Sequence, residues 1–371
     1  MSNIQLLKDL EIKLTQEYEK LKTMIEKPNI LLVGGTGVGK SSLVNLCFGK
    51  DIAEVGVGKP ITKNLKRFEI ANTPIVLFDT QGYELDEENY KSFLNEVVNY
   101  AIENREEKEK QIHIVWYCIQ APSHRIIDFD IEIINKFKEI GLPVAVVFTK
   151  CDRITSKQIL MMEQVITREL PDIPQFRVTI EAFLNYLDLE KLCTWSIENL
   201  PKGLRLAFIA AQKVNLQAKK KKATDIVIEH SSGSAFVGFV PIPFSDAPIL
   251  LANQAGMLAR IIFIYDMQSL LPTIQGLVGT FGLPTIISNT GIWLVGEFMK
   301  LIPGIGTFTG GLISGSVAST LTLAIGLSTI EICHKMHSLV IDGNVDKIES
   351  YINNAEKIFE SLVKEKMDTK L

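Results

Sequence analysis

The sequence predicts an α/β fold with a mostly parallel six-stranded sheet, followed by a separate all-α, apolar domain. Between Asn29 and about residue 200, short apolar runs alternate with helical segments, which is typical of a parallel sheet covered on both faces. Beyond residue 230 charged residues become scarce, and the runs Met267–Gly296 and Ile302–Ile330 contain none. We therefore expect three parts: an N-terminal amphipathic helix at 1–27, an α/β domain at 28–200 and an apolar helical domain at 201–371.

The first expected element is a helix over residues 3–27. Its apolar residues recur every three or four positions, from Leu7 through Leu14 to Ile25, and Pro28 ends it. A stripe of this kind packs against other helices, and a coiled coil with a partner is the alternative. We expect this helix and a C-terminal helix at about 343–366 to fold onto the apolar domain.

Six apolar runs are the expected strands of the sheet. The second and third runs are separated by Asn72 and Thr73, which favours a hairpin. Helices are expected between the runs, near residues 41–48, 87–109, 126–140, 155–169 and 184–198. The six runs read NILLVGG, LKRFEI, PIVLFD, IHIVWYC, PVAVVFT and FRVTI.

Composition limits the compartment and the partners. The chain has 371 residues, of which 46% are hydrophobic and 22% charged, so it can form a packed core and wholesale disorder is excluded. A net charge of -4 provides no global attraction to nucleic acid. The five cysteines are scattered without a CxxC pair, which fits a reducing compartment, and the charged N-terminus does not resemble a signal peptide. We therefore expect a cytoplasmic protein with no nucleic-acid partner.

A glycine-rich turn directly follows the first expected strand. Residues Gly34–Ser41 match the pattern G-x-x-x-x-G-K-[ST] between a strand and a helix. Glycines let backbone N–H groups point at a polyphosphate, and the following helix presents its positive end. Lys40 would reach the β- and γ-phosphates, and Ser41 would ligate Mg²⁺; a simple glycine turn is the alternative. The expected nucleotide-binding residues here are Gly35, Thr36, Gly37, Val38, Gly39, Lys40, Ser41 and Ser42.

Two further motifs stand at strand ends, where ligands of such sheets bind. Asp79, at the end of the third run, is the acidic residue expected to hold the Mg²⁺ shell, and Gly82 could offer its N–H to the γ-phosphate; a helix-capping aspartate is the alternative. Thr149, Lys150 and Asp152 end the run PVAVVFT. A carboxylate there can accept two hydrogen bonds from guanine, whereas adenine offers no matching pair. This motif favours GTP over ATP.

These motifs together resemble the Era-like, translation-factor-related GTPases. The resemblance implies that Thr62 is the threonine that ligates Mg²⁺ and contacts the γ-phosphate when GTP is bound, so Lys40, Thr62 and Gly82 are the expected catalytic residues. A strand-initiating role is the alternative for Thr62. It also implies a base-contacting pair, for which Glu181-Ala182 is the nearest match, so Ala182 is a candidate nucleotide-binding residue.

Two departures from that family bear on catalysis. Tyr83 stands where Ras-like enzymes carry a water-positioning glutamine, and Gly37 stands where potassium-activated relatives carry an asparagine. We therefore expect slow hydrolysis without potassium activation, unless another residue, a second protomer or an activator completes the site.

The second half resembles the hydrophobic helical module of the YcjF-like membrane proteins. The resemblance covers roughly residues 200–340 and rests on the segments 238–248 and 300–306. Both uncharged runs are long enough to span a bilayer, but 15 of the 29 residues in Ile302–Ile330 are Gly, Ser or Thr, so a soluble bundle stays open. The run Lys219–Lys222 is either a solvated helix face or a contact for anionic lipid.

The function expected from these patterns is that of a GTPase. It would bind GTP or GDP with Mg²⁺, hydrolyse GTP slowly and act as a switch coupled to the helical domain, in the cytoplasm or at a membrane. The alternative is a nucleotide-dependent assembly or membrane-remodelling protein with little turnover, resembling immunity-related or dynamin-like GTPases, which would form homo-oligomers with GTP bound.

Overall fold

The computed structural model describes residues 3–49, 57–62, 64–69, 73–80, 87–123, 125–179, 187–237, 247–268 and 315–342, together with isolated positions between 344 and 366. The chain divides into two compact units, which are described separately. One unit comprises Ile25–Asn215, and the other comprises Met1–Met24 with Leu216–Leu371.

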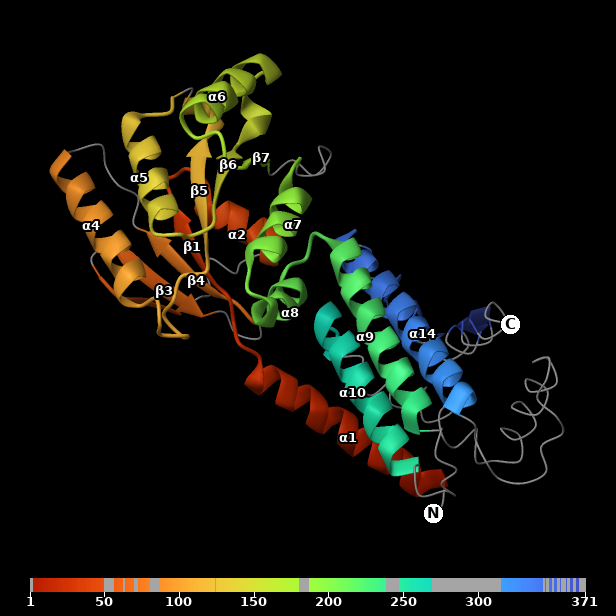
Figure 1. Cartoon of the computed structure of the whole chain (residues 1–371). Helices are drawn as coiled ribbons and strands as arrows, with labels where there is room; N and C mark the ends of the chain where they lie inside the picture. Colours follow the sequence, from red (N-terminus) through yellow and green to blue (C-terminus); the bar gives the residue numbers. More distant parts are fainter. Residues whose placement is uncertain are drawn as a thin grey trace. The chain divides into compact units, whose positions relative to one another are not determined.

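The Ile25–Asn215 unit contains a seven-stranded sheet in the order β2-β3-β4-β1-β5-β6-β7 (Figure 1). Neighbouring strands from β4 to β7 are parallel, and β3 pairs antiparallel with both β2 and β4. Six strands come from the predicted runs, and the short edge strand β2 is added to them. The mostly parallel α/β fold is thereby confirmed. The strands are β1 (Asn29–Val33), β2 (Val57–Pro60), β3 (Leu65–Glu69), β4 (Val76–Thr80), β5 (Ile114–Gln120), β6 (Val144–Thr149) and β7 (Gln175–Arg177).

Helices cover both faces of this sheet because its strands are apolar on both sides. One face packs against α4 (Glu87–Glu103), α5 (Asp128–Glu139) and α6 (Ser156–Glu169). The other face packs against α2 (Lys40–Phe48), α7 (Leu189–Asn199) and α8 (Lys202–Ala211). On that second face Phe48 stacks on Trp116 with ring centroids 5.9 Å apart. The two apolar layers, one on each face of the sheet, fix the positions of the strand ends.

The described residues of the second unit form helices, and the N-terminal helix is one of them. The long helices of this unit are α1 (Asn3–Met24), α9 (Leu216–Val237), α10 (Ala247–Tyr265) and α14 (Gly315–Ile341). Helix α1 packs on α10, where Tyr18 meets Phe263 edge to face with centroids 6.2 Å apart. Helices α9, α10 and α14 pack on one another. In the described residues, the predicted helical domain is thus confirmed as several C-terminal helices that group with the N-terminal helix.

The lysine run in α9 is not simply a solvated face. The Lys219 side chain is fully buried, and its Nζ donates to the Ile264 carbonyl over 2.6 Å. The Nζ atom of Lys220 lies 3.0 Å from Glu331 Oε1 on α14. Two of the four lysines therefore make interactions within the helical unit.

Among the helices that the structure describes, none is both long and apolar enough to cross a membrane. Residues 269–296 of the first uncharged run, residues 302–314 of the second, and the segments 238–246 and 300–306 lie outside the described residues.

Candidate nucleotide site

The predicted site residues that the structure describes lie at the carboxyl ends of the parallel strands. The glycine-rich turn leaves β1 and enters α2, Asp79 lies near the end of β4, and Thr149 ends β6. Because β4, β1, β5 and β6 are neighbours in the sheet, their ends meet at one edge (Figure 1). The sheet topology therefore brings three motifs that are distant in the sequence to one place.

The backbone of the turn requires glycine at two positions where it approaches other strands. Gly34 has φ +143°, and a Cβ built there would lie 2.3 Å from the Cys118 carbonyl oxygen on β5. Gly39 has φ +106°, and its Cβ would lie 3.4 Å from Thr149 Cβ on β6. Both conformations disfavour residues with side chains. These glycines seat the turn against β5 and β6.

The Lys40 ammonium lies inside the turn. Its Nζ donates to the carbonyl of Gly34 over 2.7 Å and to that of Gly35 over 3.2 Å, and the residue is only 8% exposed. Ser41 and Ser42 follow in the first turn of α2 and are exposed. The loop thus holds a buried cation next to the exposed start of a helix, an arrangement suited to an anionic ligand.

Asp79 and Thr62 carry buried oxygens with unused hydrogen-bonding capacity. Within the described part of the chain, Asp79 Oδ1 and Thr62 Oγ1 make no hydrogen bond. Asp79 Oδ1 lies 4.0 Å from Lys40 Nζ. Burial raises the pKa of Asp79, while Lys40 and Lys66 act to lower it. A buried polar oxygen without a partner is costly, so both oxygens are poised for a ligand.

The geometry of the β3–β4 hairpin brings Thr62 to the end of β4. The Thr62 N–H donates to the Leu65 carbonyl over 3.2 Å, and Leu65 lies opposite Thr80 in the antiparallel register. The turn that carries Thr62 therefore stands at the end of the strand that carries Asp79. A carboxylate and a hydroxyl are oxygen ligands of the type that Mg²⁺ prefers, so these residues fit the metal expected from the sequence.

The Thr149–Asp152 motif contacts the glycine-rich turn directly. The Thr149 hydroxyl donates to the Val38 carbonyl. Lys150 has φ 57°, and its Nζ donates to the Gly37 carbonyl over 2.6 Å and to Gln120 Oε1 over 3.0 Å. The lysine stem thus runs from the end of β6 to the turn. An aliphatic stem in this position offers an apolar surface on which a planar base could lie.

Asp152 is positioned by a residue that the sequence analysis missed. The Thr179 hydroxyl, which is buried after β7, donates to Asp152 Oδ1 over 2.5 Å. The Asp152 side chain is 12% exposed, so a base could still reach it. The sequence feature that could have identified Thr179 is its hydroxyl group, which follows the strand beside β6.

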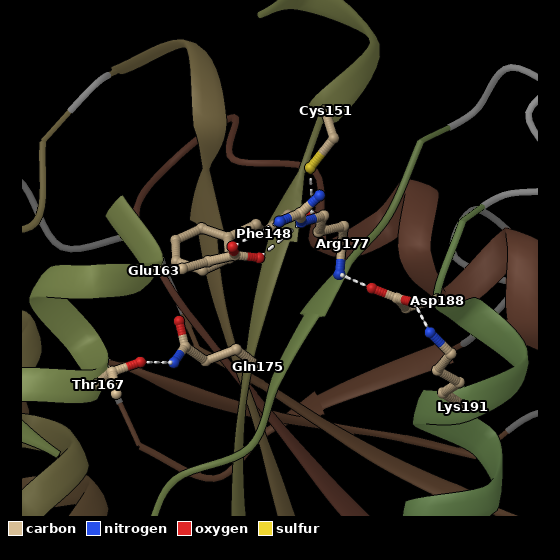
Figure 2. Close-up of polar contacts among 8 residues, drawn as sticks. All are labelled: Phe148, Cys151, Glu163, Thr167, Gln175, Arg177, Asp188 and Lys191. Carbon is tan, nitrogen blue, oxygen red and sulfur yellow. Dashed lines mark hydrogen bonds and ion pairs between the residues drawn. The ribbon is translucent and has the colours of Figure 1, made fainter. Parts of the chain in front are cut away.

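Figure 2 shows a polar network around Arg177 on β7, the strand that Thr179 follows. The Arg177 guanidinium forms two 2.6 Å hydrogen bonds with Glu163 of α6. The Arg177 N–H donates to Asp188 Oδ2 over 3.1 Å, and the Asp188 N–H donates back to the Arg177 carbonyl over 2.8 Å. Because β7 is an edge strand, these bonds replace the missing neighbour and hold Val178 and Thr179 beside β6.

Gly82, Tyr83 and the Glu181-Ala182 pair lie outside the described residues. Among the described ones, the structure brings together the glycine-rich turn, Lys40, Asp79 and Lys150.

Comparison with known proteins agrees with this geometry. The family model described as 50S ribosome-binding GTPase matches residues 29–150. The chain is 31% identical over 174 residues to a probable GTP-binding protein EngB of Flavobacterium psychrophilum, a match that covers 43% of this chain and 83% of that protein. The chain belongs to the P-loop GTPase family. Its relatives include the GTPase Era and several probable GTP-binding proteins EngB.

The relatives differ in how much of their length this chain covers. GTPase Era of Caldicellulosiruptor saccharolyticus is 25% identical over 177 residues, a match that covers 47% of this chain and about half, 55%, of Era. Among solved structures, a probable GTP-binding protein engB is similar at 18% identity over 48% of this chain and 98% of that one, with a TM-score of 0.34. These two sequence matches cover 47% and 43% of the chain, and the family model matches residues that lie within the Ile25–Asn215 unit.

Proposed function

We propose that this protein binds GTP and GDP with Mg²⁺, hydrolyses GTP slowly and acts as a nucleotide-dependent switch coupled to its helical unit. The proposal is carried by two buried oxygens without a hydrogen bond, Thr62 Oγ1 and Asp79 Oδ1, of which the second lies 4.0 Å from the Lys40 ammonium. Family membership supports a guanine nucleotide as the ligand. Neither oxygen makes a hydrogen bond within the described residues, and a metal-bound polyphosphate would give both of them a role.

Each residue has a distinct part in binding. Lys40 would exchange the carbonyls of Gly34 and Gly35 for the β- and γ-phosphate oxygens. Backbone N–H groups of the turn and of Ser41 and Ser42 would donate to the phosphates. Ser41, Thr62 and Asp79 would hold Mg²⁺, which neutralises charge on the phosphates when bound.

Base selection is assigned to the Thr149–Asp152 motif. The Asp152 carboxylate would accept hydrogen bonds from the guanine N1–H and exocyclic amine, while the Lys150 stem covers one face of the base. The Thr179 hydroxyl holds the carboxylate by its Oδ1 atom. Adenine presents an acceptor where guanine presents N1–H, so the same carboxylate disfavours ATP. Ala182 is kept as a proposed base contact.

Hydrolysis requires a water molecule oriented toward the γ-phosphate, and Tyr83 replaces the usual glutamine. Turnover is therefore proposed to be slow, with the Thr62 turn and Gly82 sensing the γ-phosphate. The test is phosphate release from GTP at increasing protein concentration, for the wild type, Lys40→Ala, Thr62→Ala and a control, Lys202→Ala, which removes an exposed lysine at the start of α8.

We expect wild type and Lys202→Ala to release phosphate at equal slow rates, and the two site variants to lose the activity. GTP binding without phosphate release at any protein concentration would reject the hydrolase. If GTP-dependent oligomers formed in that case, the assembly protein named as the alternative would replace it.

The helical unit is proposed to respond to the nucleotide at a membrane surface. Support comes from the scarcity of charge in residues 267–330 and from the resemblance to YcjF-like modules. Burial of Lys219 and pairing of Lys220 leave Lys221 and Lys222 as the part of the lysine run suited to anionic lipid. Flotation with anionic and neutral vesicles, in GTP and in GDP, tests this. Equal absence from all vesicle fractions would reject the membrane role and leave nucleotide binding untouched.

A further inference from the structure

A lysine lies directly across the sheet from the proposed metal-binding aspartate. In the antiparallel register of β3 and β4, Lys66 pairs with Asp79. Residues directly opposed in such a pair have Cβ atoms about 5 Å apart and point to the same face of the sheet. Lys66 was not part of any motif in the sequence, because only the register of the hairpin brings it to Asp79.

Packing shows which face this is. Two residues after Lys66, Phe68 contacts the core on the α2 side of the sheet, and its partner Leu77 lies in that core. Arg67 lies opposite Phe78, which belongs to the core on the α4 side. Since side chains alternate along a strand, Lys66 points to the face of Lys40 and Asp79, whereas Arg67 points to the other face.

The Asp79 carboxylate therefore has a lysine on two sides. Lys40 Nζ lies 4.0 Å from Oδ1, and Lys66 lies opposite in the register. Both lysines act to lower the pKa of Asp79 against the larger effect of burial. A divalent cation that approaches this carboxylate would meet a resident positive charge, and at low dielectric such repulsion is strong.

We propose that Lys66 is a built-in cation of the phosphate site, which competes with Mg²⁺ for Asp79 and makes nucleotide retention less dependent on the metal. This inference rests on the proposed function. With Lys66 present, part of the positive charge that faces the phosphates belongs to the protein and stays when Mg²⁺ leaves. Without Lys66, Mg²⁺ binds more tightly, and removal of Mg²⁺ accelerates nucleotide release more strongly.

The test measures release of fluorescent GDP from the full chain as free Mg²⁺ is varied, with excess EDTA as the metal-free point. Four proteins are compared: wild type, Lys66→Ser, Lys66→Arg and Arg67→Ser. Lys66→Arg keeps the charge, and Arg67→Ser removes a charge from the neighbouring residue on the opposite face. Thermal unfolding of each variant confirms that it is folded.

We expect Lys66→Ser to lower the half-saturating Mg²⁺ concentration about tenfold and to release GDP about tenfold faster in EDTA. Lys66→Arg and Arg67→Ser should behave as the wild type. If a folded Lys66→Ser variant binds GDP with an unchanged or higher half-saturating Mg²⁺ concentration, the role of Lys66 is rejected and the proposed function stands. If the wild type bound no GDP at any Mg²⁺ concentration, the proposed function would fall as well.

Discussion

The Thr179 hydroxyl donates a 2.5 Å hydrogen bond to Oδ1 of Asp152, the carboxylate proposed to select guanine. Thr179 is buried, and Arg177 holds its strand through Glu163 and Asp188 (Figure 2). The Oδ1 atom of Asp152 is therefore held in place by the Thr179 hydroxyl. The carboxylate plane is set before a base arrives, which reduces the ordering cost of binding.

The first prediction concerns this hydrogen bond. Thr179→Val keeps the shape of the side chain but removes the donor, so Asp152 loses its fixed orientation. We expect GDP affinity to fall about tenfold, equivalent to about 1.4 kcal/mol, as measured by calorimetry. Thr179→Ser keeps the hydroxyl and should bind within about twofold of the wild type. Equal losses in both variants would show that methyl packing, and not the hydrogen bond, matters.

The second prediction concerns the close approach of the glycine-rich turn to β5. A Cβ at Gly34 would lie 2.3 Å from the Cys118 carbonyl oxygen, and φ +143° is itself strained for any other residue. Gly34→Ala should therefore destabilise the protein by about 2 kcal/mol or more and weaken GDP binding, because the turn must move. Thermal unfolding with and without GDP measures both effects.

Gly203→Ala is the matched control for Gly34. Gly203 lies in α8, and a Cβ there would meet nothing within 4 Å. Its unfolding temperature should stay unchanged or rise, since alanine favours a helix over glycine. A Gly34→Ala variant as stable as Gly203→Ala would contradict the described turn.

The third prediction tests helix packing in the all-α unit. A Cβ at Gly326 of α14 would lie 2.5 Å from Val227 Cγ2 of α9 and 3.0 Å from Met257 Sδ of α10. Gly326→Ala should destabilise this unit by about 1–3 kcal/mol through overpacking. The double change Val227→Ala with Gly326→Ala removes the clash and should recover part of the loss in a double-mutant cycle. Strict additivity of the two single changes would contradict this contact.

The fourth prediction concerns pH. Burial lowers the pKa of His113 to about 4, and its Nδ1 accepts the Asn29 N–H over 2.9 Å, which requires the neutral ring. The unfolded chain gains a proton on His113 near pH 6.5, whereas the folded chain gains it only near pH 4. Stability is therefore full above about pH 6.5 and falls as the pH drops from there to 4.

His113→Asn isolates this effect, because its amide oxygen can accept the same N–H without titrating. The unfolding temperature should fall less between pH 7 and pH 4.5 in the variant than in the wild type, because unfolding of the variant no longer takes up a proton at position 113. Equal pH dependence in both proteins would show that His113 does not stay neutral in the folded state.

Much of this architecture was predictable, because local patterns determine it. Apolar runs indicated six strands, and the motif ending at Ser41 indicated the glycine-rich turn between β1 and α2. Strand β2 was not predicted, because the sequence Val57–Pro60 has no apolar alternation and forms only an edge strand beside β3.

Contacts that depend on register could not be read from the sequence. Thr179 meets Asp152 because β7 runs parallel to β6, with Phe148 opposite Arg177. Lys66 meets Asp79 because the hairpin pairs those two positions and not their neighbours. Likewise, the sequence indicated that Lys219–Lys222 form one charged, solvated helix face. In the structure Lys219 is buried and donates to the Ile264 carbonyl near the end of α10. These relationships arise from tertiary packing.

The central claim is that one site cages a polyphosphate at the β1–α2 turn and selects guanine through Asp152. Calorimetric titration of the full chain with GDP and with ADP, both with Mg²⁺, tests it most directly. We expect GDP to bind with a Kd of about 10 µM or tighter, equivalent to about -7 kcal/mol, and ADP to bind at least about a hundredfold more weakly. Equal affinity for the two nucleotides, or no binding of GDP, would contradict the account.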